Sequence, residues 1–437
     1  MLPPSVLSVL RRLNDAGFAA YAVGGCVRDV LLGRVPVDWD VTTAARPEQV
    51  MALFPGQSIP TGLQHGTVTV RSGGMSVEVT TFRADGVYSD HRHPDEVRFS
   101  SDLAEDVKRR DFTVNAMTMD ASGALTDLFG GRADLQNRVI RCVGDPQRRF
   151  EEDALRILRA LRFASVLDFT VEPVTAAAIR ALTPTLKCIA AERITAEMTK
   201  LLCGAAACRV LLEFPDVVGV FLPEVLPAVG FDQRNVHHVY DVWGHTAHAV
   251  GAAEDDGVVR WTMLFHDLGK PECFTLDDHG VGHFYGHGRH SLAMAMDAMA
   301  RLKFSNEHRD QVAKLVDWHD RVIPVTPKGM RRCLNALGPE GTRRLIAVKR
   351  ADNLAQAPAY RSRQQQLDEA EEIVADLLAQ DACFSLKQLA VNGNDMTALG
   401  LRGSAVGDML RALLEQVLAE NLPNDREALL TWTKEHL

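Results

Sequence analysis

Several features that mark common protein classes are missing from this sequence. No apolar run is long enough to span a bilayer, and the first residues lack the basic lead, apolar core and small-residue cleavage site of a secretory leader. Aromatic residues make up only 6% of the chain, and its eight cysteines contain no CxxC pair and no regular spacing. We therefore expect a cytoplasmic protein with no membrane partner, whose cysteines are buried thiols that form neither a zinc site nor a disulfide frame.

The overall composition is that of an ordinary globular protein. The chain has 437 residues, of which 46% are hydrophobic and 24% charged, so it can bury a sizeable core without disulfides. At roughly 150 residues per domain, this length suggests about three domains. The net charge of −9 argues against nonspecific binding of polyanions. A local patch of arginine and lysine can still hold phosphates, so the net charge decides little.

Two changes of pattern divide the chain. From Tyr21 to about Ile140, short β-rich runs alternate with turn residues and one or two helices. After Pro146 the apolar residues follow a long helical periodicity, and from about Phe231 histidines become frequent. We therefore predict an α+β fold class, with a catalytic head of mixed sheet and helices at residues 1–140, an all-α neck at 141–212, a histidine-rich helical domain at 213–375 and a helical tail at 376–437.

A pair of aspartates in the head indicates metal chemistry. Asp38 and Asp40 are two residues apart, so on an extended segment both carboxylates project to the same face. Mg²⁺ prefers hard oxygen ligands and keeps the rest of its coordination sphere for water or phosphate oxygens. Such a pair suits a two-metal nucleotidyl transfer, which usually needs a third acidic ligand. Glu78, in the alternating run SVEVTTF, is the candidate because a neighbouring strand could bring it beside the pair.

The preceding glycine turn makes this signal more specific. Gly24-Gly25, followed by Arg28, predicts a tight turn at a helix start, where backbone N–H groups and the arginine could hold a triphosphate. A DxD pair alone is more often part of a solvated loop, and a GG pair alone is usually only a turn. With GG-x-x-RD placed ten residues ahead of DxD, the two form a specific constellation.

These motifs and their order resemble the bacterial tRNA nucleotidyltransferases, the CCA-adding family, and the related bacterial poly(A) polymerases. The resemblance runs from about Tyr21 to Gly204. It implies the mixed-sheet head, Mg²⁺ dependence, and tRNA, CTP and ATP as partners. Beyond the glycine and aspartate segment, four ordered blocks carry the resemblance: RRDFTVNAM (109–117), DLFGGRADLQNRVIRCVGD (127–145), FEEDALRILRALRFA (150–164) and ERITAEMTKLL (192–202).

In the family, the EDxxR block replaces a nucleic-acid template. Here the block is Glu152 to Arg156. Its Asp153 and Arg156 are three residues apart and would be neighbours on one helix face. Cytosine and adenine both offer an amino donor beside a ring acceptor, which matches an Asp and Arg pair. Guanine and uracil place a carbonyl where the amino group should be. The predicted helix would therefore select C and A.

The resemblance assigns further nucleotide contacts. It implies that Arg159 and Arg162 contact phosphates or base, and that Arg110 and Asp111 lie near the incoming sugar. For a helix standing alone, the arginine stripe would instead be a solvated face, opposite Leu155, Leu158 and Leu161. The polar stretch at 83–108 predicts a loop that is mobile in part. Relatives that stop after two cytidines have this loop shortened, so its full length implies addition of the terminal A.

The histidine-rich domain contains a second candidate metal site. The order H…HD…D resembles the HD phosphohydrolases, and two further histidines fall where binuclear members place extra ligands. These six positions predict an HD-type domain holding Ni²⁺, Mn²⁺ or Mg²⁺, with possible accessory phosphohydrolase activity. A lone HD dipeptide would more often be a surface accident. We interpret His237, His238 and His248 as helix-surface histidines, and expect Tyr240 and Trp243 to pack. The predicted ligands are His245, His266, Asp267, His287, His319 and Asp352.

The leading hypothesis is therefore an enzyme that adds C, C and A to the 3′ end of tRNA. The neck and tail would measure the tRNA by shape and backbone contacts. Three alternatives remain open: an A-adding enzyme that works beside a separate CC-adding one, a poly(A) polymerase, and an HD-type phosphohydrolase or nucleotide sensor whose head only binds. The intact Asp38 and Asp40 pair argues against the last of these.

Overall fold

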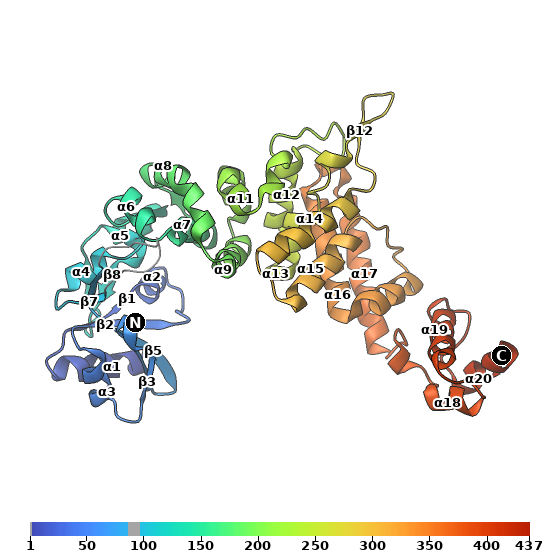
Figure 1. Ribbon diagram of the computed structural model, residues 1–437, viewed down its shortest axis with the longest axis horizontal. Coiled ribbons are helices and arrows are strands. Elements are labelled where there is room, and N and C mark those ends of the chain that lie inside the picture. The colour runs from blue at the N-terminus through green and yellow to red at the C-terminus, as the bar shows by residue number, and fades with distance from the viewer. Residues whose placement is uncertain (1, 86–96) are drawn as a thin grey trace. The chain divides into compact units, whose positions relative to one another are not determined.

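The computed structural model describes residues 2–85 and 97–437 (Figure 1). Contacts within the chain divide it into two compact units, one ending at Pro223 and the other running from Glu224 to Leu437. Within the described residues, no helix has the length and apolar character needed to cross a membrane. The eight cysteines are all free thiols. The expectation that they are buried is wrong for Cys188, whose side chain is exposed, and for the half-buried Cys203, Cys208 and Cys273.

The first unit is built on a seven-stranded mixed sheet with strand order β3-β4-β5-β2-β1-β8-β9. β2 and β5 run parallel, whereas the other neighbouring strands of this sheet are antiparallel. This arrangement confirms the α+β fold class. The strands are β1 (Ala20–Val23), β2 (Trp39–Thr43), β3 (Ser58–Gly62), β4 (Thr67–Ser72), β5 (Met75–Thr81), β8 (Met117–Met119) and β9 (Leu125–Asp127).

Alternation along the strands separates a core face from a polar face. In β5, Val77 and Val79 are buried and Glu78 between them is exposed, because successive side chains of a strand point to opposite sides. Helices α1 (Pro4–Asp15) and α3 (Pro47–Leu53) pack on β4 and on each other. Their apolar residues therefore cover the sheet, while its other face carries the acidic side chains.

The segment from Phe82 to Arg109 is only partly described. Strand β6 (Arg83–Asp85) pairs with β7 (Val97–Phe99), and α4 (Leu103–Lys108) follows. Both ends of the predicted mobile loop are thus regular structure. The remainder of that prediction falls on residues 86–96, which lie outside the described residues.

A bundle of helices completes the first unit. Its central helix α7 packs against α9, and Leu155, Leu158 and Leu161 of α7 are buried as the sequence predicts. The remaining helices of the first unit are α2 (Gly25–Leu31) and α5 (Gly131–Asn137) in the head, then α6 (Pro146–Glu152), α7 (Leu155–Leu167), α8 (Pro173–Leu182), α9 (Ala191–Leu202), α10 (Ala207–Glu213) and α11 (Pro215–Phe221).

The prediction that Asp153 and Arg156 share one helix is wrong. α6 ends at Glu152 and α7 begins at Leu155, and Asp153 between them has extended dihedral angles (φ −143°, ψ 103°). Its Oδ1 accepts a hydrogen bond from the N–H of Leu155 at 3.0 Å. Aspartate favours such local bonds over helix continuation, and here the side chain accepts from the first N–H of α7.

The second unit is mostly helical, with a small hairpin of β12 (Thr275–Leu276) and β13 (Gly282–His283). Its longest helix, α16, is kinked at Gly338 and Pro339, where proline cannot continue the helical hydrogen bonding. The tail, α18 to α20, has its own apolar core. The helices are α12 (Val242–Ala252), α13 (Gly257–Phe265), α14 (His287–Arg301), α15 (Asn306–Trp318), α16 (Pro327–Ala355), α17 (Gln364–Ala379), α18 (Gly393–Ala398), α19 (Ser404–Leu418) and α20 (Arg426–Glu435).

Candidate active site and a second metal-ligating cluster

Three carboxylates of the head converge on the polar face of the sheet. Asp40 of β2 and Glu78 of β5 are direct partners in the parallel register, and Asp38 lies in an exposed bend just before β2. Burial raises the pKa of Asp40, and the nearby charges of Glu78 and Asp38 raise it further, although Arg110 opposes them. Because like charges repel, this cluster is stabilised by a cation that several carboxylates can share.

The glycine turn passes directly beside these carboxylates. Gly24 has φ +84°, a conformation that L side chains rarely adopt. A Cβ at this position would lie 3.1 Å from Arg110 Nη1 and 3.9 Å from Asp40 Oδ2. On α2, which begins at Gly25, the buried Arg28 donates from Nη1 to Asn115 Oδ1 at 2.7 Å. Because Gly24 has no side chain, the backbone of the turn can lie close to Arg110 and Asp40.

The RRD block ties the sheet to the neck helices. Asp111 accepts hydrogen bonds on Oδ2 from Arg159 of α7, with a distance of 2.8 Å from Nε. Burial of Asp111 opposes its ionisation, but the charge of Arg159 and its hydrogen bonds lower the pKa to about 2. Arg110 Nη2 lies 3.5 Å from Asp106 Oδ2. Thus Asp111 pairs with an arginine of the neck helix α7, whereas Arg110 lies near the carboxylates of the sheet.

The arginine stripe of α7 is not a solvated face. Arg156 is buried, and it donates from Nη1 to Glu152 Oε2 at 2.7 Å and from Nη2 to the carbonyl of Arg109 at 3.2 Å. Arg162 is half-buried and donates to Glu197 Oε1 at 3.2 Å. One neighbour of Asp153 was missed by the sequence reasoning: Arg193 of α9 lies 3.7 Å from Asp153 Oδ2.

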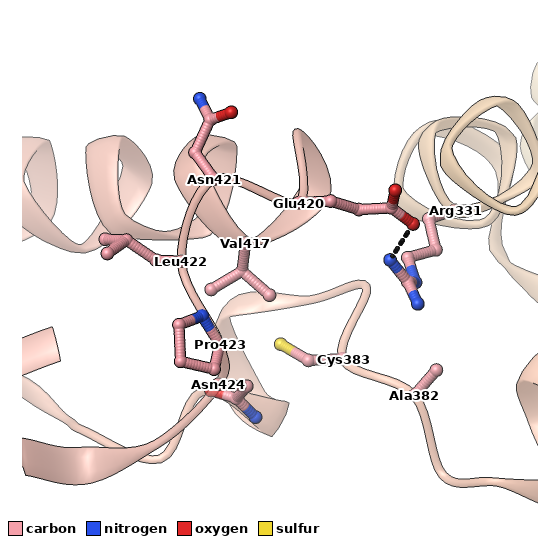
Figure 2. Close-up of a pocket in the computed structure, with 9 residues that line it drawn as sticks. All are labelled: Arg331, Ala382, Cys383, Val417, Glu420, Asn421, Leu422, Pro423 and Asn424. Atoms are coloured by element: carbon pink, nitrogen blue, oxygen red, sulfur yellow. Dashed lines mark hydrogen bonds and ion pairs between the residues drawn. The ribbon is translucent and has the colours of Figure 1, made fainter. Parts of the chain in front are cut away.

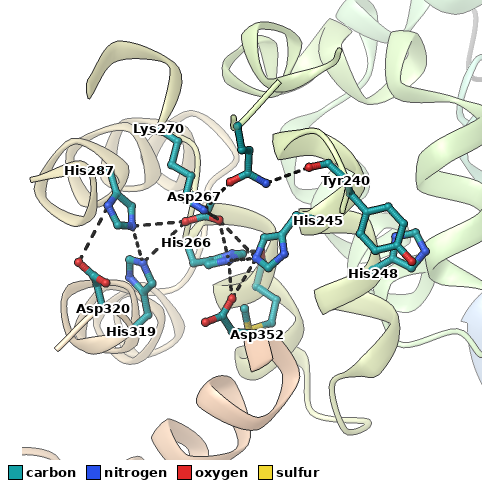
Figure 3. Close-up of polar contacts among 12 residues, drawn as sticks. Tyr240, His245, His248, His266, Asp267, Lys270, His287, His319, Asp320 and Asp352 are labelled. Carbon is teal, nitrogen blue, oxygen red and sulfur yellow. Dashed lines mark hydrogen bonds and ion pairs between the residues drawn. The ribbon is translucent and has the colours of Figure 1, made fainter. Parts of the chain in front are cut away.

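A tighter cluster of possible metal ligands lies in the second unit (Figure 3). His245 of α12, His266 and Asp267 after α13, and Asp352 of α16 meet there. His245 Nε2 lies 2.9 Å from Asp352 Oδ1 and 3.4 Å from Asp267 Oδ2, and His266 Nε2 lies 3.2 Å from Asp267 Oδ2. Two ring nitrogens and two carboxylates therefore surround one point.

The other oxygen of Asp267 faces a second group. Its Oδ1 lies 3.4 Å from His287 Nε2 and 4.0 Å from His319 Nε2. The ligand atoms of His245, His266 and Asp267 all lie within 4.8 Å of one another, as do those of Asp267, His287 and His319. Among the described residues, the head carboxylates do not form so tight a group. Asp267 thus lies between two groups of candidate ligand atoms, and belongs to both.

The rings of three histidines are held with Nε2 inward. The Nδ1 atoms of His266, His287 and His319 lie 2.6 to 2.9 Å from backbone carbonyls of Met263, Phe284 and Val316. A carbonyl can only accept a hydrogen bond, so each Nδ1 carries the proton and each Nε2 is free to ligate. This arrangement fixes both the tautomer and the ring orientation that a metal site needs.

The cluster opens into a polar pocket of about 310 Å³. Sequence reasoning missed Lys270, whose Nζ lies 2.7 Å from Asp267 Oδ2 and also donates to Gln233. It also missed His238, which lines the pocket and whose ring centroid lies 4.8 Å from that of His245. Burial lowers the pKa of His238 to about 3. These groups give the pocket a cation and a neutral imidazole beside the ligands.

The interpretation of the other histidines needs a correction. His237 and His238 precede α12 in irregular structure and are not on a helix, and His237 packs against Tyr360. His248 does lie on α12, where its ring stacks on Tyr240 with centroids 3.9 Å apart. Packing of Tyr240 and of the buried Trp243 agrees with the expectation.

Another pocket of the second unit has few groups that could take part in catalysis (Figure 2). It has a volume of about 490 Å³ and lies where the kinked helix α16 meets the tail. Its walls mix apolar and polar side chains, and an ion pair joins Arg331 and Glu420 at 2.7 Å. The buried thiol of Cys383 has its pKa raised by burial, which disfavours the reactive thiolate.

A mixed sheet that places acidic side chains beside a glycine turn, followed by a helical neck, defines the chain as a nucleotidyltransferase. Residues 20–141 match the Poly A polymerase head domain, residues 168–215 match the "Probable RNA and SrmB-binding site of polymerase A", and residues 289–433 match the second domain of tRNA nucleotidyltransferases. The CCA-adding enzyme of Lactobacillus helveticus is 35% identical over 424 residues, which cover 97% of this chain and 94% of the relative. The chain belongs to the CCA-adding enzyme family.

Further relatives agree with this assignment. The CCA-adding enzyme of Geobacillus stearothermophilus is 44% identical over 275 residues, 62% of this chain and 65% of that enzyme. The crystal structure of the Bacillus stearothermophilus CCA-adding enzyme in complex with CTP superposes with a TM-score of 0.78, at 31% identity, covering 100% of this chain and 98% of the other. The Thermotoga maritima CCA-adding enzyme complexed with tRNA shares the fold, with a TM-score of 0.60 at 18% identity.

Proposed function

We propose that the chain adds C, C and A, from CTP and ATP, to the 3′ end of tRNA without a nucleic-acid template. The observation that carries this proposal is the pairing of Asp40 with Glu78 beside Asp38 and the Gly24 turn. It is supported by likeness to CCA-adding enzymes over nearly the whole chain. The head would hold the reacting groups, and the neck (141–212) and tail (376–437) would hold the tRNA.

Divalent cations fit this carboxylate cluster, and Mg²⁺ is the ion we propose. Asp40 is half-buried among like charges that raise its pKa, and it lies close to exposed Asp38 and Glu78. Hard oxygen ligands of this kind suit Mg²⁺. When bound, the ions activate the attacking 3′-hydroxyl and stabilise the leaving pyrophosphate. Asp38 and Asp40 act as ligands, and Glu78 completes the acidic set.

Arginines of the head and neck bind and orient the nucleotide. We propose that Arg28 and the backbone at Gly25 hold the triphosphate, since both lie at the glycine turn. Arg110 faces Asp40 and lies near the incoming sugar. Asp111 pairs with Arg159 and so joins this sugar site to α7. Arg162 lies one turn further along α7 and would contact the phosphates or the base.

Selection of C and A rests on the junction of α6 and α7. Asp153 accepts from the N–H of Leu155, so its carboxylate lies at the start of α7 with the other oxygen toward Arg193. Arg156, one turn later, is fixed by Glu152 and the carbonyl of Arg109. We propose that Asp153 accepts from the amino group of cytosine or adenine while Arg156 donates to the ring acceptor. A carbonyl in place of that amino group would face Asp153 unpaired.

Incorporation assays distinguish the proposal from its rivals. Transfer RNA lacking its 3′ end is incubated with Mg²⁺ and with CTP, ATP or both. We expect two additions from CTP, a third from ATP, and no extension with GTP or UTP. Use of ATP only after a preformed CC end would identify an A-adding enzyme, and long A tails would identify a poly(A) polymerase. No extension would contradict nucleotidyl transfer altogether.

The second unit supports a further candidate activity, hydrolysis of phosphate esters. The observation that favours it is the bridging position of Asp267 between two groups of inward-facing histidines. We propose that His245, His266, Asp267 and Asp352 hold one divalent ion, Ni²⁺, Mn²⁺ or Mg²⁺, and that Asp267, His287 and His319 hold another. Lys270 at the pocket wall would orient a phosphate. On this proposal residues 213–375 form an HD-type domain, and all of its candidate ligands lie in the second unit, which begins at Glu224.

Hydrolysis of a 2′,3′-cyclic phosphate or a phosphodiester tests this candidate. We expect activity in the native chain with added Ni²⁺ or Mn²⁺ and none in a His266→Ala/Asp267→Ala variant. An exposed pair, His290 and Glu272, with 3.0 Å between Nδ1 and Oε2, provides the matched control, and its double alanine variant should keep full activity. A native chain that hydrolyses neither ester with either metal would contradict the candidate.

A further inference from the structure

Asp106 is a fully buried carboxylate that the reaction scheme above does not use. It lies on α4 with no exposed surface. Its Oδ1 accepts from Arg109, at 3.0 Å from Nε and 2.8 Å from Nη2, and its Oδ2 accepts from Thr42 Oγ1 at 2.9 Å. Burial of an unpaired carboxylate would destabilise the fold. The bonds from Arg109 and Thr42 offset this, so the site accommodates an ionised Asp106.

The partners of Asp106 lead to the carboxylates of the head. Thr42 follows Asp40 by two residues on β2, so both side chains lie on the same face of the sheet. Arg110 Nη2 lies 3.5 Å from Asp106 Oδ2, and Arg110 Nη1 lies against the Gly24 turn. The charge of Arg110 also reaches Asp40, whose pKa it lowers. One guanidinium thus contacts Asp106 and also acts electrostatically on Asp40, and Arg110 Nη1 and Asp40 Oδ2 both lie within 4 Å of the position that a Cβ on Gly24 would take.

The position of Arg110 between Asp106 and Asp40 affects metal binding. A guanidinium attracted by two carboxylates lies between them, but after loss of one it pairs fully with the other. Without the charge of Asp106, Arg110 would therefore move onto Asp40. An ion pair there would occupy the oxygens that a divalent cation needs, and would draw the guanidinium away from the site proposed for the incoming sugar.

We propose that Asp106 is a positioning residue for nucleotidyl transfer, which holds Arg110 over the Gly24 turn and so leaves Asp40 open to a divalent cation. This inference rests on the proposed function of the head. It adds a residue that touches neither nucleotide nor metal and acts through Arg110.

The test compares Asp106→Asn and Asp106→Glu with the native chain in two measurements. The first is the Mg²⁺ concentration that gives half-maximal CMP incorporation. The second is the Mg²⁺ concentration that gives half of the CTP-dependent rise in Tm, which reports binding without catalysis. We expect Asp106→Asn to raise both concentrations about tenfold, the size of a typical coupling between contacting charges. Asp106→Glu, which keeps the charge, should stay near the native values.

A second substitution separates positioning from a general structural role. Arg110→Met removes the competing cation, so Asp106→Asn/Arg110→Met should need the same Mg²⁺ concentration as Arg110→Met alone. A purely structural defect would instead add to the effect of Arg110→Met. Glu172→Gln is the matched control, because Glu172 is another paired carboxylate of this unit, 3.2 Å from Arg141 and bonded to Thr175.

The outcomes are distinguishable. An unchanged Mg²⁺ requirement in Asp106→Asn, or additive effects in the double variant, would overturn the role of Asp106. Absence of incorporation by the native chain would overturn the proposed function, and the Tm measurement would still decide between the variants. If Asp106→Asn does not fold, Asp106→Ser is compared in the same way.

Discussion

Asp40 and Glu78 are register partners across the parallel strands β2 and β5, so their carboxylates leave the sheet side by side. Residues that lie 38 positions apart in the chain thereby form one acidic surface. A parallel pair needs a long crossover connection, and here α3, β3 and β4 supply it. The position of Glu78 is therefore fixed by the topology of the whole head.

Replacement of Asp40 by asparagine should abolish catalysis without harming the fold. We expect incorporation to fall at least about 100-fold, because a ligand of the transition-state cations is lost. Folding raises the pKa of Asp40, so the ionised carboxylate opposes folding at neutral pH and its removal should not lower the Tm. Parallel incorporation assays and thermal unfolding check this. A folded variant with near-native incorporation would remove Asp40 from the site.

The Gly24→Ala variant should lose both activity and stability. Its φ of +84° makes an alanine strained by about 1–3 kcal/mol, and the new Cβ would crowd Arg110 Nη1 at 3.1 Å. Gly17→Ala is the control, because Gly17 has φ +85° but nothing within 4 Å of the added Cβ. We expect both variants to unfold more easily, and only Gly24→Ala to lose incorporation. Equal activities would show that the close approach has no role in catalysis.

Loss of Asp153 should blur nucleotide choice more than it slows the reaction. Without the carboxylate, the repulsive contact with guanine or uracil disappears, and discrimination should weaken by about 1–3 kcal/mol. Because Asp153→Ala also removes a side-chain hydrogen bond at the start of α7, Asp145→Ala is the control: Asp145 caps α6 by accepting from the N–H of Gln147 at 3.0 Å. Incorporation of each nucleotide is measured separately for both variants. Full discrimination in Asp153→Ala would contradict the template role.

The pair of Asp111 and Arg159 should make the first unit sensitive to acid. Folding lowers the pKa of Asp111 from 3.8 to about 2, so the ionised form stabilises the fold. This contribution, about 2 kcal/mol, is fully present above about pH 4 and is lost as the pH falls towards 2. Urea unfolding of native and Asp111→Asn chains should therefore differ most at neutral pH and converge below pH 4. If the difference in unfolding free energy between the two chains grew as the pH fell, the ionised Asp111 would not be stabilising the fold.

Metal content tests the cluster of the second unit. After loading with Mn²⁺ and dialysis without nucleotide, we expect two ions per chain, and one in His287→Ala, which lacks a ligand of the second position. Chelation should lower the Tm, because ions bound to the native state stabilise it. His290→Ala, an exposed histidine, should bind as the native chain does. Unchanged metal content in His287→Ala would exclude the second position.

Much of this architecture could be predicted from local patterns. Alternation in the run SVEVTTF placed Glu78 on the polar face of a strand, and the six spaced histidines and aspartates of the second unit do converge, Asp352 through its contact with His245. Such predictions succeed where periodicity fixes which side of an element a residue occupies. The catalytic and binding roles of these residues remain predictions.

Other features depend on contacts that the pattern does not contain. The break at Asp153 gives no signal in the sequence because its flanks are both helical, and it depends on the hydrogen bond from the Leu155 N–H to the Asp153 side chain at the start of α7. Asp106 reads as an ordinary helix-surface acid until Thr42 and Arg109 are brought against it. His238 gives no signal either, since its place beside His245 depends on an irregular segment before α12.

The central claim is that Asp38, Asp40 and Glu78 hold divalent cations that bring a terminal ribose hydroxyl and a nucleoside triphosphate together. Crystals soaked with Mg²⁺ and CTP measure this directly, and anomalous scattering after exchange for Mn²⁺ identifies the ions. The account predicts metal density bridging Asp38, Asp40 and the triphosphate, beside Glu78 and the Gly24 turn. Nucleotide bound with no metal at these carboxylates, or with the triphosphate directed away from them, would contradict it.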